Sequence, residues 1–387
     1  MPPRQLRIAA VVNDLSGNCL VRTYPIVKVL ERRHRVEVIG FVGQEGIFPP
    51  YKNEMVYRPF PLGGSPASKA RSLLGLVRSI DADVIYAFKP VCTSYGVALL
   101  SWLGKRRPIV LDIEDWDNEA FEALDWRGKL GHAVRNIPRP NGFYNWLTDS
   151  LHGIADQKTV ASNFLLRRYG GIKLPHGANP RTFDPHLYDR EAIRKHFGIA
   201  DKRVIVFAGT VRSHKGLIEL ADAVDKLGRG DVVLALVGAR TPELDEMLVR
   251  GKSKIMYWGP QPHGRMPEVW LAADLVVLPQ KDTRFAQAQI PGKVFEAMAM
   301  ARPIIATAVS DLPEILEGCG WIVPPESWDA LVAAMGEVFS DPIGAEEAGY
   351  RARQRFLDRY SWDVMQGILD GVFAPFTSGD GYGKSAR

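Results

Sequence analysis

Residues Gln287 to Glu317 read QAQIPGKVFEAMAMARPIIATAVSDLPEILE, and this stretch decides the fold. After a polar loop, the apolar residues of Lys293 to Met300 recur at helical spacing, which predicts a short helix. A proline ends that helix, and Ile304 to Ala306 reads as a short buried strand before a helix that opens near Ser310. This alternation of helix and strand is typical of an α/β protein.

Glu296 lies in the first turns of the predicted helix. Helix N-termini carry partial positive charge and N–H groups without helical partners, so they attract phosphates and hydroxyls. A carboxylate at this position can accept hydrogen bonds from both hydroxyls of a ribose. The alternative is that Glu296 only stabilises its own helix through the helix dipole.

The stretch resembles the donor-sugar motif of retaining glycosyltransferases with the GT-B fold, most closely glycosyltransferase family 4. Glu296 followed by Ala297-Met298-Ala299 matches the second Glu of that motif, whereas the first Glu is replaced by Ala288. The departure at Ala288 leaves open how the hydroxyls of the donor sugar are held. The resemblance implies that Glu296 holds the donor ribose and that the sugar or phosphates contact Gln289, Ile290, Pro291, Gly292 and Lys293.

A chain of 387 residues predicts two domains, because single hydrophobic cores stop growing near roughly 250–300 residues. The apolar runs Leu6 to Asn13 and Arg203 to Ala208 each precede a glycine-containing loop and a helical pattern, as at the start of a doubly wound sheet. With the resemblance, we predict an α/β protein of GT-B type, in which two Rossmann-like domains face a cleft and a C-terminal helix returns to the first domain. The predicted ranges are 1–175 and 361–376 for the first domain, 176–360 for the second, and 377–387 for a disordered tail.

The loop after the strand at 203–208 is GTVRSHKG, residues Gly209 to Gly216. Glycines let the backbone approach a ligand, and N–H groups and cationic side chains can converge there on one anion. The loop resembles the family's phosphate-binding segment, although Thr210 replaces the usual Arg; the alternative is a solvated basic turn. The resemblance assigns the donor phosphates to Lys215, Arg212, Gly209 and Thr210, and the nucleotide base to the loop at Gly259.

In the first half, the loop at Gly17 lacks a full G-x-G-x-x-G, so a dinucleotide fingerprint is not supported. The resemblance places Gly17 near the donor phosphates or the acceptor. The Gly- and Pro-rich residues 43–65 predict a long surface loop, and residues 153–161 predict a strand. Residues 116–145 are interpreted as an excursion near the acceptor, whose aromatic side chains face that acceptor or fill a local core.

The predicted strand at 108–113 ends in an acidic cluster that includes Asp112, Glu114 and Asp115. Carboxylates at the C-terminal end of a strand face the crevice in which open α/β sheets bind ligands. Either these acids form a solvated turn, or Asp115 or Glu114 touches the acceptor hydroxyl or the donor sugar, and we predict Asp115 as a catalytic residue. The resemblance implies no bridging metal and no cofactor other than the donor substrate.

The net charge of +5 is modest, and without a matching motif it predicts no nucleic-acid partner. Three cysteines without metal-ligand spacing, no secretory start and no apolar run of about 20 residues predict a cytoplasmic protein. Basic residues of the first half form either solvated helix ends or a face that rests on anionic lipid at the inner membrane surface. They are Lys28, Arg32, Arg33, Arg35, Lys105, Arg106, Arg107, Arg127, Lys129, Arg135, Arg139, Arg167 and Arg168.

The resemblance implies a metal-independent, hexosyltransferase-like enzyme that moves a sugar from a nucleotide-diphosphate donor, with retention, to the hydroxyl of a glycan or lipid-linked acceptor. Synthesis of cell-surface polysaccharides or glycoconjugates is the expected setting. One alternative is a nucleotide-sugar epimerase on the same fold, which would turn over the donor alone. The other is a catalytically weak nucleotide-sugar-binding protein, which the alanine at position 288 favours.

Overall fold

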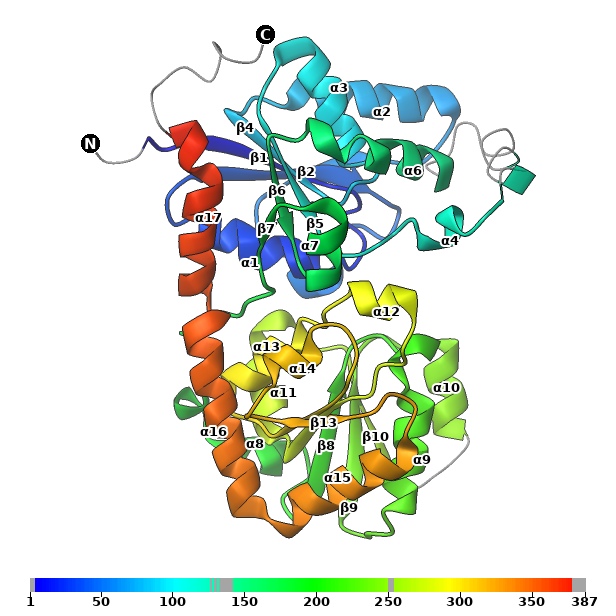
Figure 1. Cartoon of the computed structure of the whole chain (residues 1–387), viewed down its shortest axis with the longest axis vertical. Helices are drawn as coiled ribbons and strands as arrows, with labels where there is room; N and C mark the ends of the chain where they lie inside the picture. The colour runs from blue at the N-terminus through cyan, green and yellow to red at the C-terminus, as the bar shows by residue number, and fades with distance from the viewer. Residues whose placement is uncertain (1–3, 126, 129–130, 132–141, 250–253, 378–387) are drawn as a thin grey trace. The chain divides into compact units, whose positions relative to one another are not determined.

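The computed structural model describes residues 4–125, 127–128, 131, 142–249 and 254–377 (Figure 1). The chain divides into two compact units, residues 1–175 with 365–387 and residues 176–364. The predicted tail, apart from Thr377, lies outside the described residues. Within the described ranges, no helix is both long enough and apolar enough to cross a membrane.

The first unit is built on a sheet of parallel strands in the order β3-β2-β1-β4-β5-β6-β7. Its inner strands are almost entirely buried, because helices cover both faces of the sheet. The strands are β1 (Arg7–Val12), β2 (Arg35–Val42), β3 (Tyr57–Pro61), β4 (Val84–Phe88), β5 (Ile109–Ile113), β6 (Gln157–Val160) and β7 (Ile172–Lys173).

Helices α2 and α3 lie over one face of this sheet, and α1 lies over the other (Figure 1). Serine side chains cap two helix starts, since Ser65 accepts from the Ser68 N–H and Ser162 accepts from the Leu165 N–H. The helices are α1 (Leu20–Leu30), α2 (Pro66–Ser79), α3 (Tyr95–Lys105), α4 (Glu119–Glu122), α6 (Gly142–Ser150) and α7 (Asn163–Tyr169), with 3-10 turns η1 (Pro49–Tyr51) and η2 (His152–Ile154).

Two predictions for this unit are wrong in detail. Residues 43–65 are not one loop, because they contain η1 and the strand β3, which pairs with β2. Pro59 and Pro61 suggest a loop, yet an edge strand tolerates prolines, whose missing N–H costs no ladder hydrogen bond there. The strand predicted at 153–161 begins only at Gln157, after the 3-10 turn η2.

The second unit has its own parallel sheet, in the order β10-β9-β8-β11-β12-β13. Alternate residues of β8 serve opposite faces: Val204 and Val206 pack with one set of helices, and Ile205 and Phe207 with another. The strands are β8 (Arg203–Ala208), β9 (Val232–Val237), β10 (Ile255–Gly259), β11 (Leu275–Leu278), β12 (Ile304–Thr307) and β13 (Trp321–Val323).

Two layers of helices cover this second sheet. The first layer comprises α8 (Arg190–His196), α11 (Met266–Ala272), α13 (Lys293–Ala299) and α16 (Pro342–Arg359). The second comprises α9 (Leu217–Lys226), α10 (Pro242–Val249) and α15 (Trp328–Ser340). Shorter elements are η3 (Pro185–Leu187), η4 (Ser213–Lys215), η5 (His263–Arg265), α12 (Arg284–Ala288) and α14 (Leu312–Ile315).

Helix α17 (Trp362–Thr377) carries the chain from the second unit back into the first. At its start, the Trp362 N–H donates to the carbonyl oxygen of Ala178, 3.2 Å away. Farther along, Asp370 pairs with Arg33 at 2.7 Å, and the ring of Phe373 lies 5.8 Å from that of Tyr86. The predicted C-terminal helix that returns to the first domain is therefore confirmed.

Both sheets reverse their strand order at one place, between β1 and β4 in the first unit and between β8 and β11 in the second. Open α/β sheets bind ligands beyond the carboxyl ends of their strands at such a reversal. The loops that follow these four strands are therefore the segments in which a site is expected. The predicted doubly wound α/β organisation of both halves is confirmed.

Candidate functional site

The loop that joins β8 to α9, residues 209–216, requires glycine at both ends. Gly209 has a φ of +144° and Gly216 a φ of +63°, values that side chains rarely allow. A Cβ atom on Gly216 would lie 2.0 Å from the carbonyl oxygen of Pro279. This loop, called the Gly209 loop below, is therefore held against the end of β11, and it leads directly into the N-terminus of α9.

Two cationic residues lie in the Gly209 loop. Lys215, at the end of η4, is half-buried, and its ammonium donates to the carbonyl oxygen of Thr210, 3.0 Å away. Arg212 is exposed on the same turn. The loop thus presents a positioned ammonium, a second cation and the first N–H groups of a helix at one strand end, which suits an anionic group.

The adjacent strand ends are tied to this loop by backbone hydrogen bonds. The Gly209 N–H donates to the Val237 carbonyl oxygen at 2.7 Å, and the Gly238 N–H donates to the Gly259 carbonyl oxygen at 3.1 Å. A Cβ atom on Gly238 would lie 2.5 Å from the Gly209 carbonyl oxygen. The structure therefore brings Gly209, Thr210 and Gly259 to one edge of the second sheet.

Residues 279–292, called the β11–α13 segment, lie against the Gly209 loop. The Lys281 N–H donates to the His214 carbonyl oxygen at 2.9 Å, and the rings of His214 and Phe285 are 5.4 Å apart. At the other end of the segment, Gly292 faces His176, whose Nδ1 would lie 3.7 Å from a Cβ on that glycine. Gln289, Ile290 and Pro291 precede this glycine in the same segment, and the Ile290 side chain is buried in the core of the second unit.

Position 288, where the family motif has a Glu, is an interior position in this chain. Ala288 ends the short helix α12 and is fully buried. The neighbouring Gln287 side chain holds the segment in place, because its Oε1 accepts from the Ser310 N–H at 3.0 Å. An apolar residue at 288 therefore suits the local packing of α12.

Glu296 lies in the first turns of α13, as predicted, and is buried with 7% exposure. Its Oε2 accepts a hydrogen bond from the indole Nε1 of Trp270 in α11 at 2.8 Å, and its Oε1 lies 3.6 Å from the Lys293 ammonium. The carboxylate is thus oriented by a second helix as well as by its own helix end. The contact between Trp270 and Glu296 could not be predicted from the local sequence, because the two residues are 26 positions apart in the chain.

In the first unit, the acidic cluster at the end of β5 is not a solvated turn, so that interpretation is wrong: the Glu114 and Asp115 side chains are each only 13% exposed. Asp112 is fully buried and accepts two hydrogen bonds from Arg22 in α1, at 2.9 and 2.8 Å. Thr159 donates a third at 2.6 Å. Asp112 therefore has a structural role in the core of the unit. The acids that a ligand could contact are those that follow β5.

The Lys89 ammonium forms ion pairs with the three acidic residues that follow β5. Lys89 comes directly after β4 with a φ of +73°, and its ammonium lies 2.7 Å from Asp115, 3.2 Å from Asp117 and 3.6 Å from Glu114. Gly17 lies in the loop after β1, the other strand of the reversal. Sequence reasoning missed Lys89, although a lysine directly after a buried strand is a readable sign of a strand-end site.

Glu114 gives this cluster a dependence on pH. Burial raises the pKa of Glu114 to about 8, against the opposing attraction of Lys89. Between the unfolded Glu pKa of about 4.3 and pH 8, the folded state binds more protons than the unfolded state, so the contribution of Glu114 to stability falls as pH rises. We expect Glu114→Gln to remove this loss, so the variant should gain stability relative to the unmodified protein between pH 5 and 8.5.

Urea unfolding of both proteins at several pH values measures this difference, since all other titrating groups are shared. The expected gain reaches a few kcal/mol at the alkaline end. A difference that stays constant from pH 5 to 8.5 would contradict the raised pKa of Glu114.

The aromatic residues expected near the acceptor are partly accounted for by local packing. Trp116 and Phe121 are buried, and the Trp116 ring lies 5.6 Å from Phe164 and 4.6 Å from the Arg168 guanidinium. For the described residues 116–125, the interpretation as local core is therefore supported.

Several of the clustered basic residues have acidic partners. Lys28 pairs with Glu31 at 2.9 Å, and Arg107 pairs with Asp81 at 3.1 Å. Arg33 and Arg168 are paired as well. The positive charge available to a lipid surface is thus smaller than the sequence suggests, and Lys129, Arg135 and Arg139 lie outside the described residues.

Comparison with known proteins shows which family the second unit resembles. Residues 202–341 match the family model described as Glycosyl transferases group 1. The alpha-D-kanosaminyltransferase of Streptomyces kanamyceticus is 26% identical over 192 residues, which are 48% of this chain and 48% of that protein. A GDP-mannose-dependent alpha-(1-6)-phosphatidylinositol monomannoside mannosyltransferase of Mycolicibacterium smegmatis is 30% identical over 229 residues, 54% of this chain and 59% of that protein. The chain thus spans about half the length of these relatives.

Among solved structures, the crystal structure of Anabaena HepE in complex with UDP and glucose matches with a TM-score of 0.75 and 17% identity. The match covers 96% of this chain and 100% of that one, so both units and their connections are included. The chain therefore has the GT-B fold, and its residues 202–341 match the model of the glycosyl transferases group 1 family.

Proposed function

We propose that the chain is a retaining glycosyltransferase that moves a sugar from a nucleotide-diphosphate donor to an acceptor hydroxyl. The observation that carries the proposal is the Gly209 loop, where two glycines with positive φ place Lys215 and the start of α9 against the β11–α13 segment. A diphosphate leaving group gains negative charge as the sugar departs. Cations and N–H groups aimed at that charge are the main means by which such a transfer is accelerated.

The roles follow from these positions. Lys215 and Arg212 would offset the charge on the leaving diphosphate, while Gly209 and Thr210 allow its close approach. Glu296, held by Trp270, would accept hydrogen bonds from the ribose hydroxyls, and Gly259 would border the base. The residues from Gln289 to Lys293 would contact the sugar or the phosphates. On the first unit, Asp115 and the loop at Gly17 would form the acceptor side.

The comparisons support this donor class. The mannosyltransferase relative is named for a GDP-mannose donor and a phosphatidylinositol-linked acceptor, and the Anabaena structure contains UDP and glucose. We therefore propose a glycan or lipid-linked acceptor and a role in cell-surface glycoconjugate synthesis. The proposed reaction is metal-independent and takes place in the cytoplasm, with the inner face of the membrane as the alternative location.

A panel of UDP-, GDP-, ADP- and dTDP-sugars tests the donor class. At 100 times its Kd, the matching donor should raise Tm by about 5 °C or more, because it binds only the folded state. Product analysis without an acceptor then separates transfer from epimerisation, since an epimerase converts the donor alone. A panel in which no nucleotide sugar shifts Tm would contradict the proposal.

A further inference from the structure

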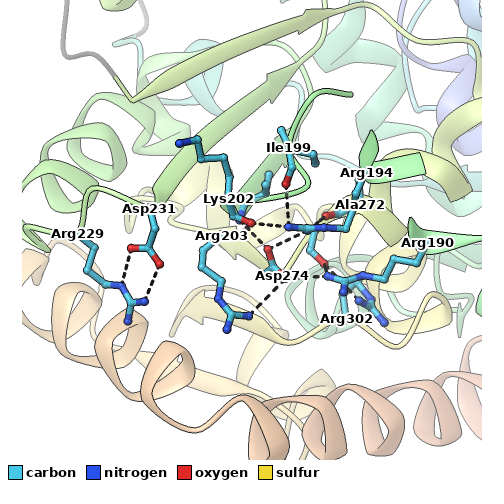
Figure 2. A network of polar contacts seen from close by, with 12 residues as sticks. Arg190, Arg194, Ile199, Lys202, Arg203, Arg229, Asp231, Ala272, Asp274 and Arg302 are labelled. Carbon is cyan, nitrogen blue, oxygen red and sulfur yellow. Dashed lines mark hydrogen bonds and ion pairs between the residues drawn. The ribbon is translucent and has the colours of Figure 1, made fainter. Parts of the chain in front are cut away.

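A second group of cations lies at the amino end of the second sheet, where β8, β11 and β12 begin. Arg203 is the first residue of β8, Asp274 precedes β11, and Arg302 precedes β12 by two positions. Figure 2 shows these side chains together with Arg190 and Arg194 from α8. This edge is opposite to the carboxyl ends that carry the Gly209 loop.

The Asp274 carboxylate at the centre of this group is already engaged. Its Oδ1 accepts from Arg190 at 2.7 Å, and its Oδ2 accepts from Arg194 at 3.0 Å and from the Val204 N–H at 2.8 Å. Arg203 remains at 3.9 Å from Oδ1, beyond hydrogen-bond distance. The carboxylate therefore anchors α8 to the sheet, and its ion pair with Arg203 is the longest of its three arginine pairs.

Arg302 is buried with 8% exposure and is held by carbonyl groups, since it donates to Met300 at 2.9 Å and to Ala273 at 3.3 Å. Among the described residues, no carboxylate forms an ion pair with it. Burial, followed by the charge of Arg190, lowers the pKa of Arg302 to about 10. A buried guanidinium in this state gains stability from an anion placed beside it.

A cavity of about 160 Å³ opens between these arginines. Arg190, Arg203 and Arg302 line it against two acids, Asp274 and Glu346, and its other wall is apolar and includes Pro342, the first residue of α16. The volume is several times the roughly 30 Å³ that one water occupies, yet below the roughly 300 Å³ at which drug-sized ligand pockets begin. The space therefore suits an anionic group rather than a whole nucleotide.

We propose that this cavity binds the phosphate group of a small phosphorylated ligand or of a lipid head group. A phosphate offers acceptor oxygens in several directions, which allows three guanidinium groups to donate to it together. This cavity is distinct from the proposed donor site, because it lies at the amino ends of the strands and the Gly209 loop lies at their carboxyl ends.

Inorganic phosphate, titrated calorimetrically at constant ionic strength, is the first probe. The measurements use the Lys215→Ala protein, so that phosphate binding at the Gly209 loop is weakened and contributes equally to every variant. Adding Arg203→Gln should raise the phosphate Kd at least about tenfold, because one charge-assisted contact is lost. Arg229→Gln is the matched control: Arg229 is about as exposed as Arg203, at 37% against 42%, but pairs with Asp231 at 2.8 Å outside the cavity.

The second probe distinguishes the source of the phosphate group. Vesicles that contain phosphatidic acid are sedimented with the same proteins, and phosphatidylcholine vesicles give the background. If Arg203→Gln, but not Arg229→Gln, weakens the binding of dissolved phosphate, a small phosphorylated ligand is supported. If Arg203→Gln weakens only the binding to phosphatidic acid vesicles, a lipid head group is supported. If Arg203→Gln and Arg229→Gln behave alike with both probes, the proposal is overturned.

Discussion

Lys215→Ala is expected to lower kcat/KM for the donor by about 100-fold or more. Removing one preorganised donor from a developing negative charge costs about 2.7–4 kcal/mol of transition-state stabilisation. In this chain the Lys215 ammonium is held by the Thr210 carbonyl oxygen at 3.0 Å, so it does not have to be ordered during the reaction. Initial rates over a range of donor concentrations, once the donor has been identified, measure the effect.

Lys226→Ala provides the matched control for Lys215→Ala. Lys226 lies at the far end of the same helix, α9, where its exposed side chain pairs with Asp329. Its loss should leave kcat/KM unchanged, because it is far from the Gly209 loop along α9. Equal rates for Lys215→Ala and Lys226→Ala would remove the assignment of the Gly209 loop to the donor phosphates.

The Gly209 loop could be predicted from sequence because its determinants are local. A buried strand, two glycines and a lysine before an amphipathic helix specify strand, turn and helix N-terminus in consecutive residues. The same holds for Glu296, whose place in the first turns of α13 follows from the helical spacing of its neighbours. Local chemistry therefore predicted the structure of each segment, whereas their common place at one ligand was implied by the family resemblance.

The partners of these residues could not be predicted, because they come from distant parts of the chain. Trp270 reaches Glu296 from another helix, and Arg22 reaches Asp112 across 90 residues. Lys89 belongs to the candidate site only because the strand order places β4 beside β1 and β5. Strand order depends on tertiary packing, which a local pattern of residues does not contain.

The buried pair Arg22–Asp112 leads to the largest expected effect on stability. Both side chains are about 1% exposed, so Asp112→Ala leaves the Arg22 guanidinium in the interior without an anion. Breaking a buried pair in this way costs about 3–5 kcal/mol of unfolding free energy. Urea unfolding, followed by circular dichroism, measures the loss, and the transition of the first unit should move to lower urea.

Asp81→Ala is the control for the geometry of the pair. Asp81 bonds to Arg7 at 2.7 Å, a distance close to the 2.8 Å of the buried pair, but both side chains are at least half exposed. Exposed pairs contribute about 0–1 kcal/mol, so this variant should unfold almost as the unmodified protein does. The contrast shows the effect of burial at matched residue types and matched shortest distance; Asp81 also pairs with Arg107 at 3.1 Å, and Asp112 also accepts a hydrogen bond from Thr159 at 2.6 Å.

A double variant without either charge distinguishes the stabilisation that the ion pair provides from the destabilisation that one unpaired buried ion causes. If an uncompensated charge dominates, Arg22→Met combined with Asp112→Ala should be more stable than Asp112→Ala alone, since no ion remains buried. Asp112 is the last residue but one of β5, so the same pair holds the strand end from which Glu114 and Asp115 extend toward Lys89. A double variant that is less stable than Asp112→Ala would instead show that Arg22 stabilises the unit through contacts other than its charge.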